Sequence, residues 1–165
     1  MLYFAYGSNM CTGRLRQRVP SANPVHIAKL LNHSLRFHKR SDDRSGKCDA
    51  FFTGEPGDEV WGVVFEIDPA EKSQLDAQEG LGLGYAEKAA LVIDAEGNRH
   101  SVFTYTAEAS HIDPALRPYS WYKRFVVEGA RQQTLPPDYI ANIEAMAATE
   151  DPDRNRDAEK RRVVC

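Results

Sequence analysis

The stretch "FAYGSNMCTGRL", residues 4–15, changes abruptly from an apolar run to a short polar turn and then to a mixed pattern. Residues 2–6 predict a buried strand, and residues 12–19 predict a short helix that ends before Pro20. The three residues between them, 7–9, are glycine, serine and asparagine. A plain chain reversal does not explain why a polar turn follows the first strand so closely.

The backbone amides of this turn are candidates for binding an anion. Gly7 can adopt positive φ and lets another group approach the backbone closely. The amides of Gly7, Ser8 and Asn9, close to the start of a helix, can hold a carboxylate or a developing oxyanion. The alternative is that Gly7 only permits a turn while Asn9 or Thr12 caps the helix.

Length and charge narrow the class of protein. A chain of 165 residues suits one domain with its own core. The net charge of -3 gives no reason to expect nucleic acid or a membrane surface as the main partner. No apolar run reaches the roughly 20 residues that span a bilayer, and no secretory leader is recognisable, so we expect a cytoplasmic protein.

The cysteines and histidines suggest neither a disulfide framework nor a metal centre. Cys11, Cys48 and Cys165 are odd in number and widely separated, which suits a reducing compartment. None of the five histidines shows a metal-ligand spacing. We therefore expect no disulfide and no metal site.

The pattern of elements predicts an α+β fold. The expected strands are residues 2–6, 25–31, 34–39, 50–54, 59–68, 86–93 and 101–106, and the expected helices are residues 12–19, 69–79, 119–132 and 137–148. Many strands with few, clustered helices favour a curved mixed, largely antiparallel sheet that closes into a β-barrel flanked by helices. We expect one domain over residues 1–148 and a charged, disordered tail over residues 149–165.

Glu79 is the candidate general base. It closes the helix that starts with the capping sequence at Asp68, just before Gly80. A carboxylate there faces the negative end of the helix dipole, which costs a few tenths to about 1 kcal/mol. Burial would raise its proton affinity and suit it to act as base and acid near neutrality. The alternative is a solvated glutamate at a frayed helix end.

Four tyrosines lie where the expected elements face the core, namely Tyr6, Tyr85, Tyr105 and Tyr122. Each hydroxyl needs a hydrogen-bond partner if the side chain is buried. They are candidates for lining a polar cavity, and the alternative for each is ordinary aromatic packing.

The segments "YFAYGSNM", "GDEVWGVVFEID", "LDAQEG" followed by Tyr85, and "YKR...GA" together resemble the γ-glutamylcyclotransferase family, which has an AIG2-like fold. The resemblance runs in order from about Tyr3 to Leu135. It implies a mixed β-barrel with a cavity at one end. It also implies a reaction that releases 5-oxoproline and an amine or amino acid from a small γ-glutamyl compound. No metal, nucleotide or covalent nucleophile is implied.

The resemblance also implies roles for individual residues. Tyr6, Gly7, Ser8 and Asn9 would hold the γ-glutamyl group, and Glu79 would be catalytic. The cavity tyrosines would be Tyr85, Tyr105 and Tyr122. The sequence departs from animal members in the basic segment "RFHKRSDDRSGKCD", residues 36–49, and in its C-terminus, which leaves the leaving amine open.

Several alternatives remain open at this level. Ser8 could be a nucleophile, but no His or Asp stands at a supporting spacing and we interpret it as a binding residue. The substrate could be a γ-glutamylamine rather than a γ-glutamyl amino acid. The protein could instead be a non-catalytic binding module, with residues 36–40 contacting RNA or an acidic partner. A solvated strand edge is the other interpretation of those residues. The chain could act as a monomer or a homodimer.

Overall fold

The computed structural model describes all 165 residues. Its strands are β1 (Leu2–Ala5), β2 (Asn23–Leu31), β3 (His33–Arg40), β4 (Gly46–Phe52), β5 (Glu59–Glu66), β6 (Tyr85–Asp94) and β7 (Arg99–Ala107). Its helices are α1 (Thr12–Arg16), α2 (Lys72–Glu79), α3 (Ser120–Gln132), α4 (Pro137–Ala145) and α5 (Arg154–Arg161). Short 3₁₀ turns form η1 (Ser8–Met10), η2 (Pro69–Glu71) and η3 (Ala109–His111). None of the helices has the length and apolar character that crossing a membrane requires.

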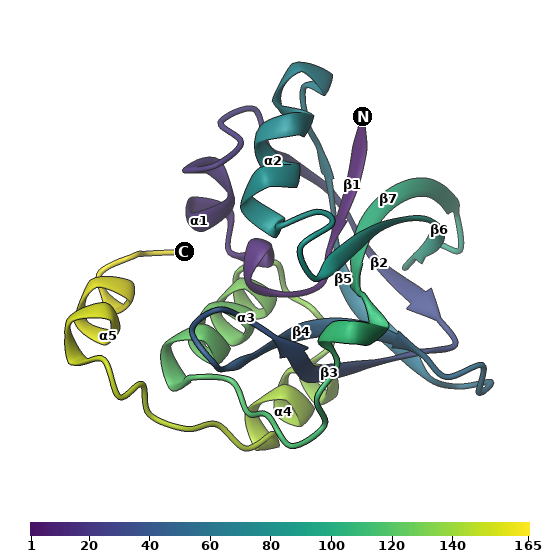
Figure 1. The fold of residues 1–165 in the computed structure, drawn as a ribbon. Helices are drawn as coiled ribbons and strands as arrows, with labels where there is room; N and C mark the ends of the chain where they lie inside the picture. Colours follow the sequence, from purple (N-terminus) through teal and green to yellow (C-terminus); the bar gives the residue numbers. More distant parts are fainter.

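Five strands form a closed barrel in the order β1-β5-β2-β6-β7, and β3 and β4 form a separate two-stranded sheet (Figure 1). β1 runs antiparallel to β5 and parallel to β7, so the first strand of the chain closes the barrel. β5 pairs with both β1 and β2, and its residues 60 and 63–65 are fully buried. The predicted α+β barrel flanked by helices is confirmed, including the central position of the strand that begins near residue 59.

Helix α3 packs directly on the turn that follows β1. Its buried face includes Tyr122, Phe125 and Val126, which join the main apolar core. A Cβ atom at Gly129 would lie 2.4 Å from the backbone nitrogen of Cys11, closer than real side chains approach. The absence of a side chain at Gly129 therefore lets the helix touch the backbone next to η1.

The polar stretch "RSDDRSGKCD", residues 40–49, has the composition of a loop, but only residues 41–45 lie between the strands β3 and β4. β4 begins at Gly46, several residues before the expected start, and pairs with β3 in antiparallel register. Its charged residues have partners: Lys47 donates to the Asp43 carboxylate at 2.6 Å, and Asp49 accepts from the His38 ring at 2.8 Å. Polar composition predicts a loop only when the side chains stay in water, and here they are paired inside the fold.

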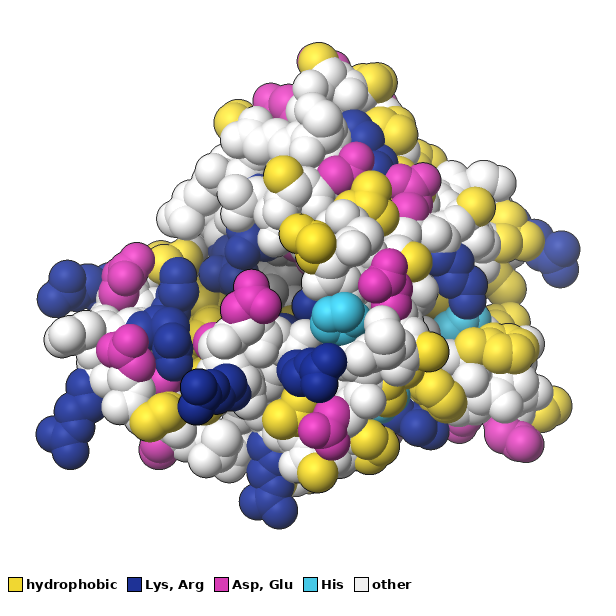
Figure 2. All heavy atoms as spheres, viewed as in Figure 1, with side chains coloured by type: hydrophobic (Ala, Val, Ile, Leu, Met, Phe, Trp, Pro, Cys, Tyr) yellow, Lys and Arg dark blue, Asp and Glu magenta, His cyan; other side chains and the backbone are white.

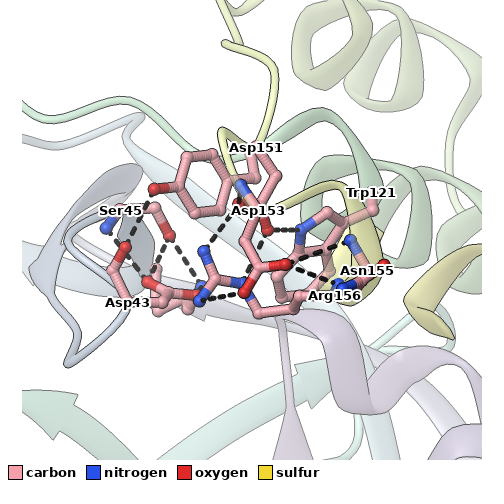
Figure 3. A network of polar contacts seen from close by, with 9 residues as sticks. Asp43, Ser45, Trp121, Asp151, Asp153, Asn155 and Arg156 are labelled. Carbon is pink, nitrogen blue, oxygen red and sulfur yellow. Dashed lines mark hydrogen bonds and ion pairs between the residues drawn. The ribbon is translucent and has the colours of Figure 1, made fainter. Parts of the chain in front are cut away.

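The C-terminal segment, expected to be disordered, is ordered in the structure and contains α5. Figure 3 shows the polar network that anchors it. Asp151 is 6% exposed and accepts from Trp121 Nε1 at 2.8 Å and from Arg156 Nη2 at 2.6 Å. Asp153 caps α5 by accepting from two backbone N–H groups of its first turn, each at 3.0 Å. Amino-acid composition could not predict this order, because it depends on a hydrogen bond between the Asp151 carboxylate and the Trp121 indole of α3.

A disulfide joins Cys11 to Cys165, two residues that are 154 positions apart in sequence, with their Cα atoms 4.7 Å apart. Cys48 is free and buried. The expectation that no disulfide forms is therefore wrong for Cys11 and Cys165. Their separation along the chain concealed the pairing, which depends on where the C-terminal segment returns to the fold.

We expect Asp151→Ala to lower the free energy of unfolding by about 1 to 3 kcal/mol, because the Trp121 and Arg156 donors lose a buried acceptor. Hydrogen bonding by Arg156 lowers the pKa of Asp151 to about 2. The ordinary pKa is about 3.9, so the interaction contributes stability above that pH and loses it as the pH falls toward 2.

Urea unfolding of parent and variant between neutral and acid pH measures both effects. Glu66→Ala, at an exposed carboxylate of β5 with no ion-pair partner, should change stability by less than about 0.5 kcal/mol. An Asp151 variant as stable as the Glu66 variant would contradict the anchoring role.

We expect a reducing agent to lower the thermal midpoint of the oxidised protein, because the bond restricts the unfolded chain. The loop-entropy model allows up to about 5 kcal/mol for a closed loop of this size. Thermal scans with and without dithiothreitol measure the effect. Cys165→Ser should melt at the lower temperature in both conditions, and a parent midpoint that ignores the reductant would rule out a stabilising bond.

Candidate active site

One cavity brings together all the site residues predicted from the sequence. The volume of this cavity is about 30 Å³. It is lined by Tyr3, Tyr6, Gly7, Ser8, Asn9, Cys48, Glu79, Tyr85, Tyr105 and Tyr122. Tyr3 and Cys48 were not predicted. Glu79 is the only acidic or basic side chain in this wall, so the inner cavity pairs one carboxylate with a mostly aromatic lining.

The turn after β1 supplies one side of the cavity. Gly7 has φ -116°, so it does not use positive φ as the sequence analysis expected. A Cβ atom at Gly7 would lie 3.0 Å from the Cβ of Cys48, so the other predicted use of the glycine, close approach to its backbone, is seen with β4. The Gly7 N–H donates no hydrogen bond within the chain, whereas its carbonyl accepts from Met10 N at 3.0 Å. Neither Asn9 nor Thr12 caps a helix.

Glu79 is held at the last position of α2 by two donors. Its Oε1 accepts from Asn9 Nδ2 at 2.9 Å and from Arg18 Nη1 at 3.0 Å. Its Oε2 accepts no hydrogen bond from the protein. The side chain is 17% exposed, and Gly80 follows in the left-handed conformation that ends the helix. The carboxylate is therefore a fixed group in a cavity and not a solvated charge at a frayed helix end.

Arg18 is a site residue that the sequence analysis missed. The same Nη1 that contacts Glu79 also donates to Asn9 Oδ1 at 3.2 Å, and Asn9 Nδ2 donates to Tyr3 OH at 3.1 Å. Tyr3, Asn9, Glu79 and Arg18 thus form one network from three separate segments. No local motif marks Arg18, because its role depends on the position of α1 relative to α2.

The predicted tyrosines have partners that fix their rings. Tyr85 OH donates to Cys48 O at 2.5 Å, Tyr105 OH donates to Asp76 Oδ1 at 2.6 Å, and Tyr122 OH accepts from Cys48 N at 3.1 Å. Tyr6 OH donates to the carbonyl of Tyr105. Burial raises the pKa of all four, so the hydroxyls stay neutral at physiological pH.

Ser8 has no nucleophile-activating partner. Its side chain makes no hydrogen bond with a His or an Asp, although it lines the cavity and is 8% exposed. The geometry gives no support for a Ser-His arrangement.

A second, outer hollow continues from the cavity. It shares Ser8, Glu79, Tyr85 and Tyr122 with the cavity, and its other lining residues are Arg14, Arg18, Lys39, Ser41, Lys47 and Gln78. Figure 2 shows this face hollowed near its centre, with dark blue Lys and Arg side chains around the recess. The space changes from neutral aromatic walls inside to cationic walls outside.

The basic segment of residues 36–40 is not uniformly a solvated strand edge. Arg36 and Arg40 are exposed, but His38 and Lys39 are buried at 4% and 7% exposure. Lys39 Nζ lies 4.5 Å from the centre of the Tyr85 ring. The register of β3 is irregular between Arg36 and Lys39, three consecutive residues (37–39) are buried there, and Lys39 lines the outer hollow.

One group of possible metal ligands lies outside the cavity. Ligand atoms of His26, Asp94 and His100 all lie within 4.8 Å of one another, and the two imidazole rings stack. The sequence showed no such spacing because the strands bring the residues together. Asp94 also accepts from Glu96 N and Asn98 N, so its carboxylate shapes the β6–β7 hairpin.

The chain is similar to known proteins over most of its length. The model of the AIG2-like family matches residues 59–143. The mouse (Mus musculus) protein named gamma-glutamylcyclotransferase is 35% identical over 154 residues, which cover 90% of this chain and 80% of that protein. The human (Homo sapiens) protein of the same name is 35% identical over 150 residues, 88% of this chain and 78% of that protein.

The chain belongs to the γ-glutamylcyclotransferase family. A solved structure named "Gamma-glutamyl cyclotransferase" superposes with a TM-score of 0.85 at 29% identity and covers 97% of each chain. The resemblance seen in the sequence motifs is thereby confirmed, together with the barrel that it implied. The cavity described above lies within this γ-glutamylcyclotransferase fold, at the ends of β1 and α2.

We expect Gly129→Ala to disturb the cavity of this γ-glutamylcyclotransferase from a distance. In an open helix the change would add up to about 1 kcal/mol of stability through helix propensity. Here the new Cβ would meet backbone atoms of Cys11 and Met10 at 2.4 and 2.7 Å, so overpacking should outweigh propensity and cost about 1 to 3 kcal/mol.

Chemical unfolding measures the loss of stability. Release of 5-oxoproline from γ-glutamyl-alanine reports the disturbance of the cavity. Arg131→Ala, at an exposed position of the same helix, is the control; it removes only an exposed ion pair with Glu144 and should stay within about 1 kcal/mol. A Gly129 variant more stable than the parent would show that α3 does not press on η1.

Proposed function

We propose that the chain catalyses the cyclisation of a γ-glutamyl amino acid or peptide to 5-oxoproline and a free amine, with Glu79 as general base and then general acid. The observation that supports this most strongly is the carboxylate itself. Glu79 Oε1 is fixed by Asn9 and Arg18 inside the cavity, and Oε2 is free for a ligand. A fixed carboxylate with one unshared oxygen suits proton transfer.

The reaction needs the substrate's α-amine to attack its own γ-carbonyl carbon. The new carbon–nitrogen bond closes the five-membered ring, and the bond from that carbon to the leaving nitrogen breaks. The α-ammonium gives up two protons on its way to the lactam N–H, and the leaving nitrogen gains two on its way to an ammonium group. Glu79 carries protons from the first nitrogen to the second and ends in its starting state.

The turn and the tyrosines would bind the γ-glutamyl group. The Gly7 N–H has no partner within the chain and lines the cavity, so it can donate to a substrate carboxylate or to the oxyanion of the tetrahedral intermediate. Ser8 and Asn9 add polar side chains beside it. Tyr6, Tyr85, Tyr105 and Tyr122 are neutral and their rings are held, which suits them to confine the bent conformer that cyclises.

The proposal includes a small γ-glutamyl compound as the ligand and no nucleic acid, in keeping with a net charge of -3. It keeps the cytoplasm as the compartment. Glutathione and thioredoxin hold cytoplasmic thiols reduced, so the Cys11–Cys165 bond would form there only after oxidation.

We expect Glu79→Gln to lower kcat at least about 100-fold, the lower end for loss of a general base, because an amide cannot take up the ammonium proton. The glutamine oxygen can still accept from Asn9 and Arg18, so the fold and the KM should change little. Release of 5-oxoproline from γ-glutamyl-alanine measures turnover, and thermal scans report the fold.

Glu66→Gln, at an exposed carboxylate of the barrel, serves as the control for this change and should retain parent activity. Near-normal turnover of the Glu79 variant with a lowered thermal midpoint would make Glu79 a structural residue and would refute the catalytic role.

A further inference from the structure

The outer hollow is lined by more positively charged side chains than negatively charged ones. Four cations line it, namely Arg14, Arg18, Lys39 and Lys47, and Glu79 is the only acidic residue in its wall. Two of the cations have anionic partners. Arg18 contacts Glu79 at 3.0 Å, and Lys47 contacts Asp43 at 2.6 Å.

Arg14 and Lys39 have no anionic partner. Arg14 makes no hydrogen bond or ion pair, its Nε is buried without a partner, and its guanidinium lies 4.7 Å from the centre of the Phe125 ring. Lys39 is 7% exposed, and the only contact of its ammonium group with an identified partner is the Tyr85 ring at 4.5 Å. Burial lowers the pKa of Arg14 to about 10 and also lowers the pKa of Lys39.

Burying a cation without a counter-charge is unfavourable, and most proteins pair such groups. Attraction to an aromatic ring compensates this cost only in part. Two such cations line the same hollow, so an anionic ligand bound there would supply the missing counter-charge. The hollow shares Glu79 with the inner cavity, so an anionic ligand bound in the hollow would lie next to the proposed catalytic carboxylate.

The reaction geometry assigns the hollow to the leaving group. The γ-glutamyl group must fold into the inner cavity, with its amine and carbonyl carbon beside Glu79. The leaving nitrogen must reach the same carboxylate to receive its protons, so the remainder of the substrate extends outward from Glu79. In an α-amino acid the carboxyl carbon is two bonds from that nitrogen. Its negative charge would lie close to Glu79 and would be repelled without nearby cations.

We propose that Arg14 and Lys39 bind the carboxylate of the departing amino acid or peptide and so determine which γ-glutamyl compounds the enzyme accepts. This inference rests on the cyclotransferase activity proposed above. It assigns a role to Lys39 of the basic segment, whose function the sequence left open. It also disfavours plain γ-glutamylamines, because an uncharged leaving group leaves both cations unpaired.

The test compares γ-glutamyl-alanine with γ-glutamyl-alaninamide, which differ only in the charge of the leaving group. The parent should prefer the alanine compound in kcat/KM. Arg14→Met and Lys39→Met should each lower kcat/KM for the alanine compound by about 10- to 100-fold, the range for a lost charge-assisted hydrogen bond. The alaninamide compound should lose no more than about threefold, so the preference collapses.

Matched variants separate charge from structure. Arg14→Lys and Lys39→Arg keep the charge and should retain most of the preference. Arg99→Met removes an exposed cation at the start of β7 and should leave both rates unchanged. The thermal midpoint of the two methionine variants should be equal to or higher than that of the parent, because a buried unpaired charge is removed.

Equal losses on the two substrates would overturn the inference, since the cations would then serve the γ-glutamyl group or the fold. Unchanged rates on both would overturn it as well. Failure of the parent to release 5-oxoproline from either compound would overturn the proposed function and this inference together. If the parent turns over substrate but the methionine variants keep its preference for the alanine compound, the inference is overturned and the proposed function stands.

Discussion

Strand β1 closes the barrel, and the site depends on that closure. Tyr3 is paired with Phe65 of β5 on one side and with Phe103 of β7 on the other. Thr104 Oγ1 adds a hydrogen bond to the carbonyl of Phe4 at 2.8 Å. Because the strand is only four residues long, its register fixes where the following turn emerges. A slip of one residue would exchange the two faces of β1 and remove the Tyr3 hydroxyl from Asn9.

The site combines two electrostatic environments across one carboxylate. Inside, Glu79 is the only charged side chain in a wall of neutral tyrosines, so its interaction with a bound ammonium group is strong in a low-dielectric space. Outside, arginines and lysines from α1, its C-terminal end and the β3–β4 hairpin surround the same carboxylate. A substrate with positive charge at one end and negative charge at the other would be oriented by this contrast.

The sequence predicted most of the inner cavity because its residues stand at the ends of recognisable elements. Glu79 closes a capped helix, and the turn at residues 7–9 follows a clear strand, so local rules marked them as candidates. The resemblance to the γ-glutamylcyclotransferase family then gave them their expected roles. Of the two reasons given for Gly7, positive φ was wrong because its φ is negative, and close approach was right because the glycine accommodates Cys48. Only the packing of β4 against the turn reveals this, and β4 lies in a segment whose composition suggested a loop.

Residues whose roles come from distant segments could not be predicted. Arg18 reaches Glu79 across 61 positions, and Trp121 reaches Asp151 across 30. Lys39 belongs to a strand pattern that is equally compatible with a solvated edge, and only the ring of Tyr85 beside it shows that it is buried. In each case the role depends on two distant segments lying side by side in the fold. Hydrophobic periodicity and turn signals report only local structure, so they cannot predict such contacts.

The link between Cys11 and Cys165 also changes how the molecule would respond to mechanical load. With the bond intact, residues 11–165 form a covalent loop, and the chain from Met1 to Cys11 is an arm outside it. A force that pulls the two ends apart would pass through that arm and the sulfur atoms, and it would bypass the rest of the backbone. Tension would detach β1 and open the barrel while α3 and the other strands remained unextended.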